Sequence, residues 1–135
     1  MHTFFWYKSW YPQISSVISA AMVFHILEYA GLKPSVITGA GLTSLVKKGL
    51  IGNAKNDVGE WLVIEADESD GSFLNLKPNV SILNNLDPEH LDHYGNFDNL
   101  KLAFKEFYDK SNNVVWNIDD KNLKSVNINI KNINY

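Results

Sequence analysis

The fold is decided by residues 63–94, which read VIEADESDGSFLNLKPNVSILNNLDPEHLDHY. Two short apolar runs, residues 61–64 and 80–83, are each followed by a stretch of polar residues. Apolar runs of this length, bounded by turn residues, are typical of strands that are covered on both faces. In open parallel sheets the ligand site lies beyond the carboxyl ends of the strands. We therefore expect the same stretch to carry two strands of the sheet and the site.

Composition narrows the class of protein. With 135 residues, of which 45% are hydrophobic, the chain is long enough for one domain or a piece of one. It contains no cysteine, which excludes disulfides and thiolate metal sites. The net charge of −3 gives no electrostatic case for a nucleic-acid partner. All basic side chains are lysines, so a bound anion would be held by lysine, backbone amides or a metal.

The pattern along the chain predicts an α/β domain with a mainly parallel sheet and flanking helices. Residues 14–30 predict a helix that is apolar nearly all round, but its serines, His25 and Glu28 argue against a membrane span. A second helix is predicted over residues 96–110, with Asn96 as its cap. Strands are expected at 35–38, 60–64, 80–86, 114–116 and 126–130, a helical turn at 72–76, and a turn or short helix from 119.

Residues 1–13 differ from the rest of the chain. They hold six aromatic side chains within residues 4–11 and show neither a helical nor a strand period. We expect a foreign or disordered extension, loosely attached, rather than a membrane anchor. Residues 14–135 would then form a domain that is incomplete at its N-terminus. If residues 1–13 could not supply a central strand, an exposed sheet edge would leave the chain marginally stable.

Two side chains after the predicted strands are candidate metal ligands. Glu65 is the first polar residue after an apolar run, where a carboxylate could bind magnesium or simply be an exposed acid. His90 lies between Glu89 and Asp92. It could bind a metal if Asp92 orients its ring, or it could form an ordinary hydrogen bond in the loop.

Asp67, Glu68 and Asp70 follow Glu65 closely. So many carboxylates in one loop repel one another, which raises the pKa of some of them unless a cation or backbone amides intervene. The alternative is a solvated acidic loop with a turn at Asp70 and Gly71. No nucleophile stands beside a base in this loop, so a two-carboxylate hydrolase is disfavoured.

Together, EADESDGSFL (residues 65–74) and NNLDPEHLDHYGNFDNLKLAFKEF (residues 84–107) strongly resemble the central domain of the Mur ligases. The resemblance is strongest to the alanine-adding, MurC-type branch. Residues 20–42 resemble the helix, strand and glycine turn that follow the family's phosphate loop. The resemblance implies a bacterial, cytoplasmic, ATP-dependent ligase of peptidoglycan synthesis. Its substrates would be UDP-N-acetylmuramate and L-alanine, with ATP and magnesium as cofactors.

Roles for individual residues follow from the same resemblance. Glu65 would be a magnesium ligand near the ATP phosphates, and His90 would bind a second metal. Asn85 would line the same cleft. Asp67, Glu68 and Asp70 would lie near the nucleotide and substrate phosphates.

One departure from the family pattern concerns the phosphate loop. The family carries a glycine-rich loop with a lysine just before the helix, whereas residues 11–19 contain neither glycine nor lysine. Since phosphates need close backbone approach and the lysine charge, ATP binding should be weakened. We also expect the family's first and third domains to be absent. We therefore expect a fragment that is inactive alone. The alternative is a non-catalytic remnant or binding module, and a separate partner chain could carry the missing domains.

Overall fold

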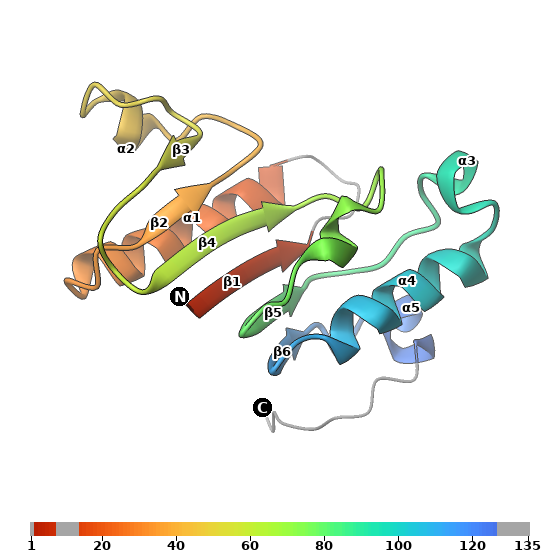
Figure 1. Cartoon of the computed structure of the whole chain (residues 1–135). Coiled ribbons are helices and arrows are strands. Elements are labelled where there is room, and N and C mark those ends of the chain that lie inside the picture. The colour runs from red at the N-terminus through yellow and green to blue at the C-terminus, as the bar shows by residue number, and fades with distance from the viewer. Residues whose placement is uncertain (1, 8–13, 127–135) are drawn as a thin grey trace.

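The computed structural model describes residues 2–7 and 14–126, with side chains from His2 and residues 17–126. Within these residues the strands form one six-stranded sheet in the order β3-β2-β4-β1-β5-β6 (Figure 1). All neighbouring pairs are parallel except β2 with β3. The strands are β1 (His2–Tyr7), β2 (Ser35–Ile37), β3 (Ala54–Lys55), β4 (Trp61–Ala66), β5 (Val80–Leu83) and β6 (Asn113–Trp116). The helices are α1 (Ile14–Tyr29), α2 (Thr43–Val46), η1 (Ser72–Asn75), α3 (Leu91–Tyr94), α4 (Phe97–Asp109) and α5 (Lys121–Ser125).

The predicted α/β architecture and most predicted elements are confirmed. Helix α4 begins after Asn96, whose side chain accepts a hydrogen bond from the backbone N–H of Asn99 at 2.9 Å. The expected strand over residues 126–130 is not found at Val126, which follows α5 as its C-cap, and the remainder lies outside the described residues. The short elements α2, β3 and α3 were not predicted, because two to four residues carry too little period to be recognised.

The expectation of a loosely attached extension is wrong for His2–Tyr7. These residues form β1, which lies between β4 and β5, with Phe4 opposite Val63 on one side and Val80 on the other. Aromatic residues favour strands, and a strand covered on both faces needs no alternating pattern. The sheet therefore has a strand at its centre, which removes the reason given for marginal stability. Residues 1 and 8–13 lie outside the described residues, and the domain boundary expected near residue 13 stays a prediction.

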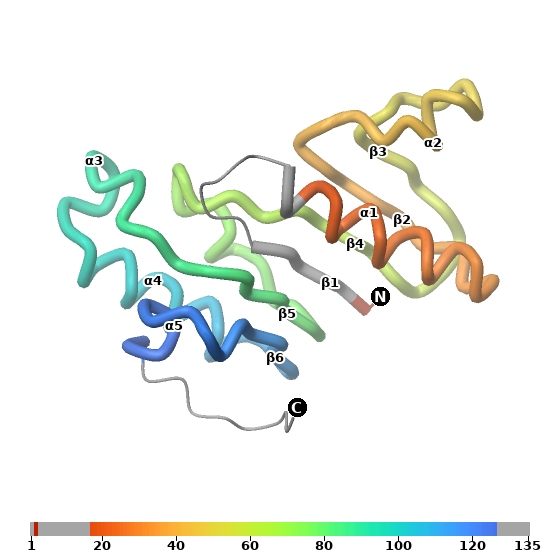
Figure 2. Tube along the Cα trace, turned by 180° about the vertical axis from the view of Figure 1, so that it is seen from behind, coloured from red at the N-terminus to blue at the C-terminus, as the bar shows by residue number. Residues whose placement is uncertain are grey.

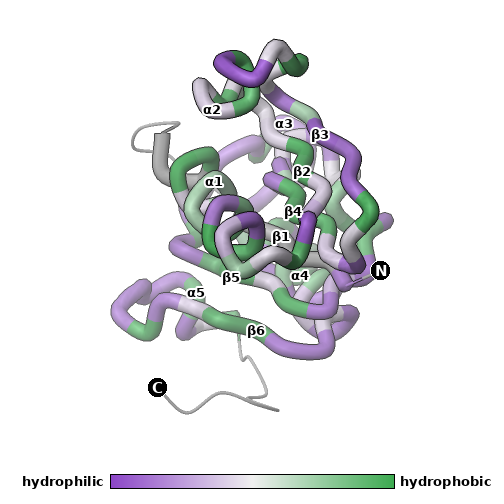
Figure 3. The backbone as a smooth tube through the Cα atoms, turned by 90° about the vertical axis from the view of Figure 1, so that its left-hand side faces the viewer, coloured by the Kyte–Doolittle hydropathy of each residue, from purple (hydrophilic) through white to green (hydrophobic). Residues whose placement is uncertain are grey.

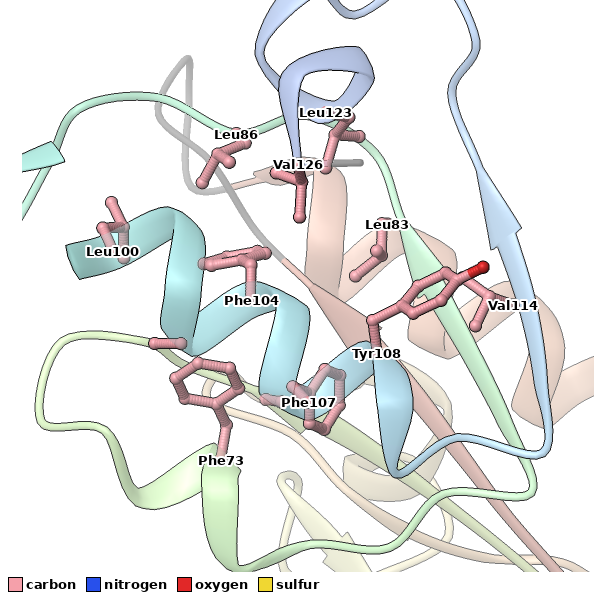
Figure 4. Packing of buried hydrophobic residues seen from close by; sticks show 12 residues of the cluster. Phe73, Leu83, Leu86, Leu100, Phe104, Phe107, Tyr108, Val114, Leu123 and Val126 are labelled. Atoms are coloured by element: carbon pink, nitrogen blue, oxygen red, sulfur yellow. The ribbon is translucent and has the colours of Figure 1, made fainter. Parts of the chain in front are cut away.

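Helices cover both faces of the sheet (Figure 2). Helix α1 packs on one face, where Ala20 and Phe24 join Val36 of β2 and Val63 of β4 in one buried cluster. Helix α4 and η1 pack on the other face (Figure 1). The larger core lies there (Figure 4): Ala66, Phe73, Leu83, Leu86, Leu100, Ala103, Phe104, Phe107, Tyr108, Val114, Leu123 and Val126.

Strand β4 contributes to both cores. Val63 belongs to the cluster under α1, whereas Ile64 and Ala66 pack against the cluster under α4. This alternation is what a strand with two covered faces requires. Figure 3 likewise shows hydrophobic residues in α1 and in strands β5 and β6. The chain leaves β4 at Ala66 and enters the acidic loop, so the core fixes the point from which that loop starts.

A polar network ties the end of α1 to the segment between β2 and β4. Glu28 Oε1 accepts hydrogen bonds from Lys48 Nζ at 2.9 Å and Lys55 Nζ at 3.0 Å. The hydrogen bond from Lys48, followed by that from Lys55, lowers the pKa of Glu28 to about 2. His25 Nε2 lies 3.0 Å from Ser44 Oγ. Because two lysines neutralise its charge, we interpret Glu28 as the residue that links α1 to the segment between β2 and β4.

Within residues 2–7 and 14–126, no helix combines the length and the apolar character that crossing a bilayer demands.

Candidate metal centre

The candidate site lies beyond the carboxyl ends of β4 and β5. The acidic loop, residues 67–71, follows β4, and residues 84–90 follow β5. Both segments run toward the side of the molecule where α3 lies (Figure 1). The site is therefore where a parallel sheet places its ligands.

Three side chains from these two segments come together. One possible ligand atom from each of Glu68, Glu89 and His90 lies within 4.8 Å of the other two. Glu68 Oε1 is 3.6 Å from His90 Nε2. Among the described residues, this is the one group of at least three histidine or acidic side chains that are close enough to share a metal ion. Two carboxylates and one imidazole offer two oxygen ligands and one nitrogen ligand.

Glu68 is the buried member of the group. It is 3% exposed, and within the described structure its Oε2 has no hydrogen-bond partner. Burial, with a smaller contribution from the charge of Asp67, raises the pKa of Glu68 to about 7. A buried carboxylate oxygen without a partner is costly, and a bound cation would relieve that cost. The residues present therefore fit a divalent cation.

The backbone at His90 is unusual. His90 has a φ of 52° and a ψ of 33°, which places a non-glycine residue in the left-handed region immediately before α3. Such a conformation costs roughly 1–3 kcal/mol and persists where the surroundings enforce it, often at functional sites. The side chain remains 38% exposed, so its ring faces both Glu68 and solvent.

Glu65 makes a different contact. Its Oε2 accepts a hydrogen bond from the backbone N–H of Gly39 at 2.8 Å, which joins the carboxyl ends of β4 and β2. The sequence suggested that Glu65 and His90 share a metal-bearing cleft, whereas the group around His90 contains Glu68 and Glu89. The role of Glu65 as a magnesium ligand stays a prediction.

The other sequence candidates form local hydrogen bonds. Asp67 Oδ1 accepts from the backbone N–H of Ser69 at 2.7 Å, and Asp70 Oδ1 accepts from that of Ser72 at 2.9 Å. The hydrogen bonds at Ser72 hold the pKa of Asp70 below its ordinary value. Asn85 Nδ2 donates to Asp87 Oδ2 at 2.9 Å. Their predicted contacts with a nucleotide stay predictions.

Sequence reasoning missed Glu89 as a ligand candidate. Glu89 directly precedes His90 and follows Pro88, so the signal was its position next to a candidate histidine after a buried strand. An acid in a polar loop is common without a metal, so this signal alone does not single out Glu89.

Comparison with known proteins decides the family. The sequence pattern of the Mur ligase middle domain matches residues 19–135 of the chain. The chain belongs to the Mur ligase family. The stretch that departs from the family's phosphate loop, residues 11–19, lies before the matched residues except for its last residue.

Individual Mur ligases support this assignment. The chain is 46% identical over 89 residues to a UDP-N-acetylmuramate–L-alanine ligase of Sinorhizobium fredii, and 47% identical over 89 residues to one of Phenylobacterium zucineum. Each match covers 66% of this chain and 18% of the relative. The structure of the UDP-N-acetylmuramate–alanine ligase MurC of Thermotoga maritima superposes with a TM-score of 0.78 at 26% identity. The superposed region covers 93% of this chain and 27% of the Thermotoga chain. The chain therefore spans about a quarter or less of the length of these relatives.

Proposed function

We propose that this Mur ligase middle domain is the magnesium- and ATP-binding part of a UDP-N-acetylmuramate–L-alanine ligase, acting in the bacterial cytoplasm. In such a reaction ATP converts a carboxylate to an acyl phosphate, and the amine of L-alanine displaces phosphate to form an amide. The 46–47% identity to ligases of that name supports these substrates.

The observation that carries the proposal is the Glu68, Glu89 and His90 group at the carboxyl edge of the sheet. It joins the two sequence stretches that resemble the family and supplies a buried carboxylate oxygen with no partner in the described structure. A divalent cation bound there would neutralise charge on a phosphoryl group.

The chain's own residues would act as follows. Glu68 and Glu89 would offer carboxylate oxygens, and His90 would offer Nε2 from the side open to solvent. Glu65 would hold the end of β2 against β4 through Gly39, and would reach a second cation from the same edge. Asp67, Asp70 and Asn85 would shape the loops that face the nucleotide and the substrate.

A second candidate function rests on one specific observation, the absence of glycine and lysine from residues 11–19. A phosphate loop needs glycine for close backbone approach and a lysine charge, and this stretch supplies neither. The chain would then be a remnant that keeps the fold and binds a cation but turns nothing over alone. Activity would require the remaining ligase domains, on the same polypeptide or on a companion chain.

Titration of the purified chain with Mg²⁺, and then with ATP in the presence of Mg²⁺, tests both candidates by calorimetry. We expect the cation to bind at one site and ATP to bind only weakly to the chain alone, with a dissociation constant of about 1 mM or above, because residues 11–19 contain neither glycine nor lysine. Failure of the cation to bind would refute the proposed site. Micromolar ATP affinity would refute the remnant and favour the ligase domain.

A further inference from the structure

Helix α3 is attached to the acidic loop through Tyr94. The Tyr94 hydroxyl donates a hydrogen bond of 2.6 Å to the backbone carbonyl oxygen of Glu68. The same carbonyl also accepts from the backbone N–H of Gly71 at 3.2 Å. The acceptor is therefore a backbone atom of Glu68, the buried member of the candidate metal site. The donor lies in α3, the helix that begins directly after His90.

This hydrogen bond closes a ring of contacts between the two segments. Tyr94 lies one helical turn after His90, and its backbone N–H donates to the His90 carbonyl at 3.1 Å. His90 Nε2 faces Glu68 Oε1 at 3.6 Å. Glu68 is thus contacted at its backbone by Tyr94 and at its carboxylate by His90, so the Tyr94 hydroxyl bridges the two ligand-bearing segments.

One further hydrogen bond keeps Tyr94 in place, and the acidic loop lies close to α3. Asn99 Nδ2 donates to the Tyr94 carbonyl at 2.7 Å, which connects α3 to the first turn of α4. Gly71, at a φ of 72°, lies so close to α3 that an added Cβ would stand 3.2 Å from His93 Nε2. Burial, followed by the charge of Glu68, raises the pKa of Tyr94 to about 12. The phenol therefore remains a donor at neutral pH.

We propose that Tyr94 is a positioning residue: its hydroxyl holds the Glu68 backbone against α3, and so keeps Glu68, Glu89 and His90 within reach of one cation. This role rests on the proposed metal site. In this structure the Tyr94 hydroxyl donates to the carbonyl of Glu68, so the role assigned to it is to hold the loop.

The test compares Mn²⁺ affinity of the unmodified chain and the variant Tyr94→Phe, measured from the free Mn²⁺ signal in electron paramagnetic resonance. Phenylalanine retains the ring, which contacts His93 at 4.7 Å between centroids, and removes only the hydroxyl. Loss of this hydrogen bond should weaken Mn²⁺ binding by about three- to tenfold. Tyr108→Phe is the matched control: Tyr108 is a buried residue of α4 in the core, and its replacement should leave the affinity unchanged.

A second readout separates positioning from general stability. If the hydroxyl were merely structural, its loss would lower the melting temperature equally with and without Mn²⁺. If it positions the ligands, its loss should also reduce the increase in melting temperature that Mn²⁺ produces. Equal Mn²⁺ affinities for the unmodified chain and Tyr94→Phe would overturn the role of Tyr94 and leave the metal site intact. Absence of binding by the unmodified chain would overturn the site and, with it, this role.

Discussion

Replacing Glu68 with glutamine should stabilise the metal-free chain by as much as about 3 kcal/mol at pH 8 and leave its stability at pH 4 nearly unchanged. The reason is the burial of Glu68, which raises its pKa from an ordinary 4.5 to about 7. The folded state binds the proton more tightly than the unfolded state, so the free energy of unfolding falls as the pH rises from about 4.5 to about 7. Glutamine carries no charge, so the free energy of unfolding of Glu68→Gln should not show this decrease with pH.

Urea unfolding of both proteins at pH 4, 6 and 8, with a chelator present, measures the effect. Glu106→Gln serves as the control, because Glu106 lies on the exposed side of α4, where its side chain is 55% exposed and pairs with Lys110. A surface pair of this kind contributes at most about 1 kcal/mol. If Glu68→Gln were less stable than the unmodified chain at pH 8, the ionised carboxylate would be well satisfied without a metal, contrary to the geometry described above.

Replacing His90 with alanine should weaken divalent-cation binding by about tenfold to a hundredfold, because the site loses its nitrogen ligand. A cation that binds only the folded state stabilises it, by about 2.7 kcal/mol at a hundred times its dissociation constant. The unmodified chain should therefore melt at a higher temperature in excess Mn²⁺, and most of that increase should disappear in His90→Ala.

The control for this variant is His25→Ala, which removes a partly exposed histidine that contacts Ser44 away from the candidate ligands. It should keep the full increase in melting temperature with Mn²⁺. An increase that survives in His90→Ala would place the cation elsewhere. Glu65 and the neighbouring acidic side chains would then be the first alternatives to examine.

Sequence reasoning recovered the larger elements because their signals are local. The stripe of Leu100, Phe104 and Phe107 marked α4, and the apolar runs before Glu65 and Asn84 marked β4 and β5. It failed at β1, because aromatics without a period look the same in a central strand and in an unstructured tail.

The sequence named His90 as a metal ligand and Glu68 as a residue near the phosphates, and the structure brings both together with Glu89, which the sequence did not single out. That these side chains bind a metal stays a prediction. The ends of β4 and β5 located the two loops. The pKa of Glu68 is raised, but chiefly by burial rather than by repulsion within the acidic cluster, and the pKa of Asp70 is lowered. Which acid turns inward depends on the path of the loop between Ala66 and Phe73. That path is fixed by contacts distant in sequence, such as the one between Tyr94 and the Glu68 carbonyl. Spacing along the chain could not distinguish Glu68 from Glu65.

The central claim is that Glu68, Glu89 and His90 surround one divalent cation, and paramagnetic Mn²⁺ tests it most directly. A chain of 15.3 kDa is small enough for assigned amide resonances, and Mn²⁺ broadens those nearest to it. At substoichiometric Mn²⁺ we predict that the amides of Glu68, Glu89 and His90 broaden first, and that those of His25 and Lys48 remain sharp. Broadening centred on another part of the chain, or no selective broadening, would contradict the account.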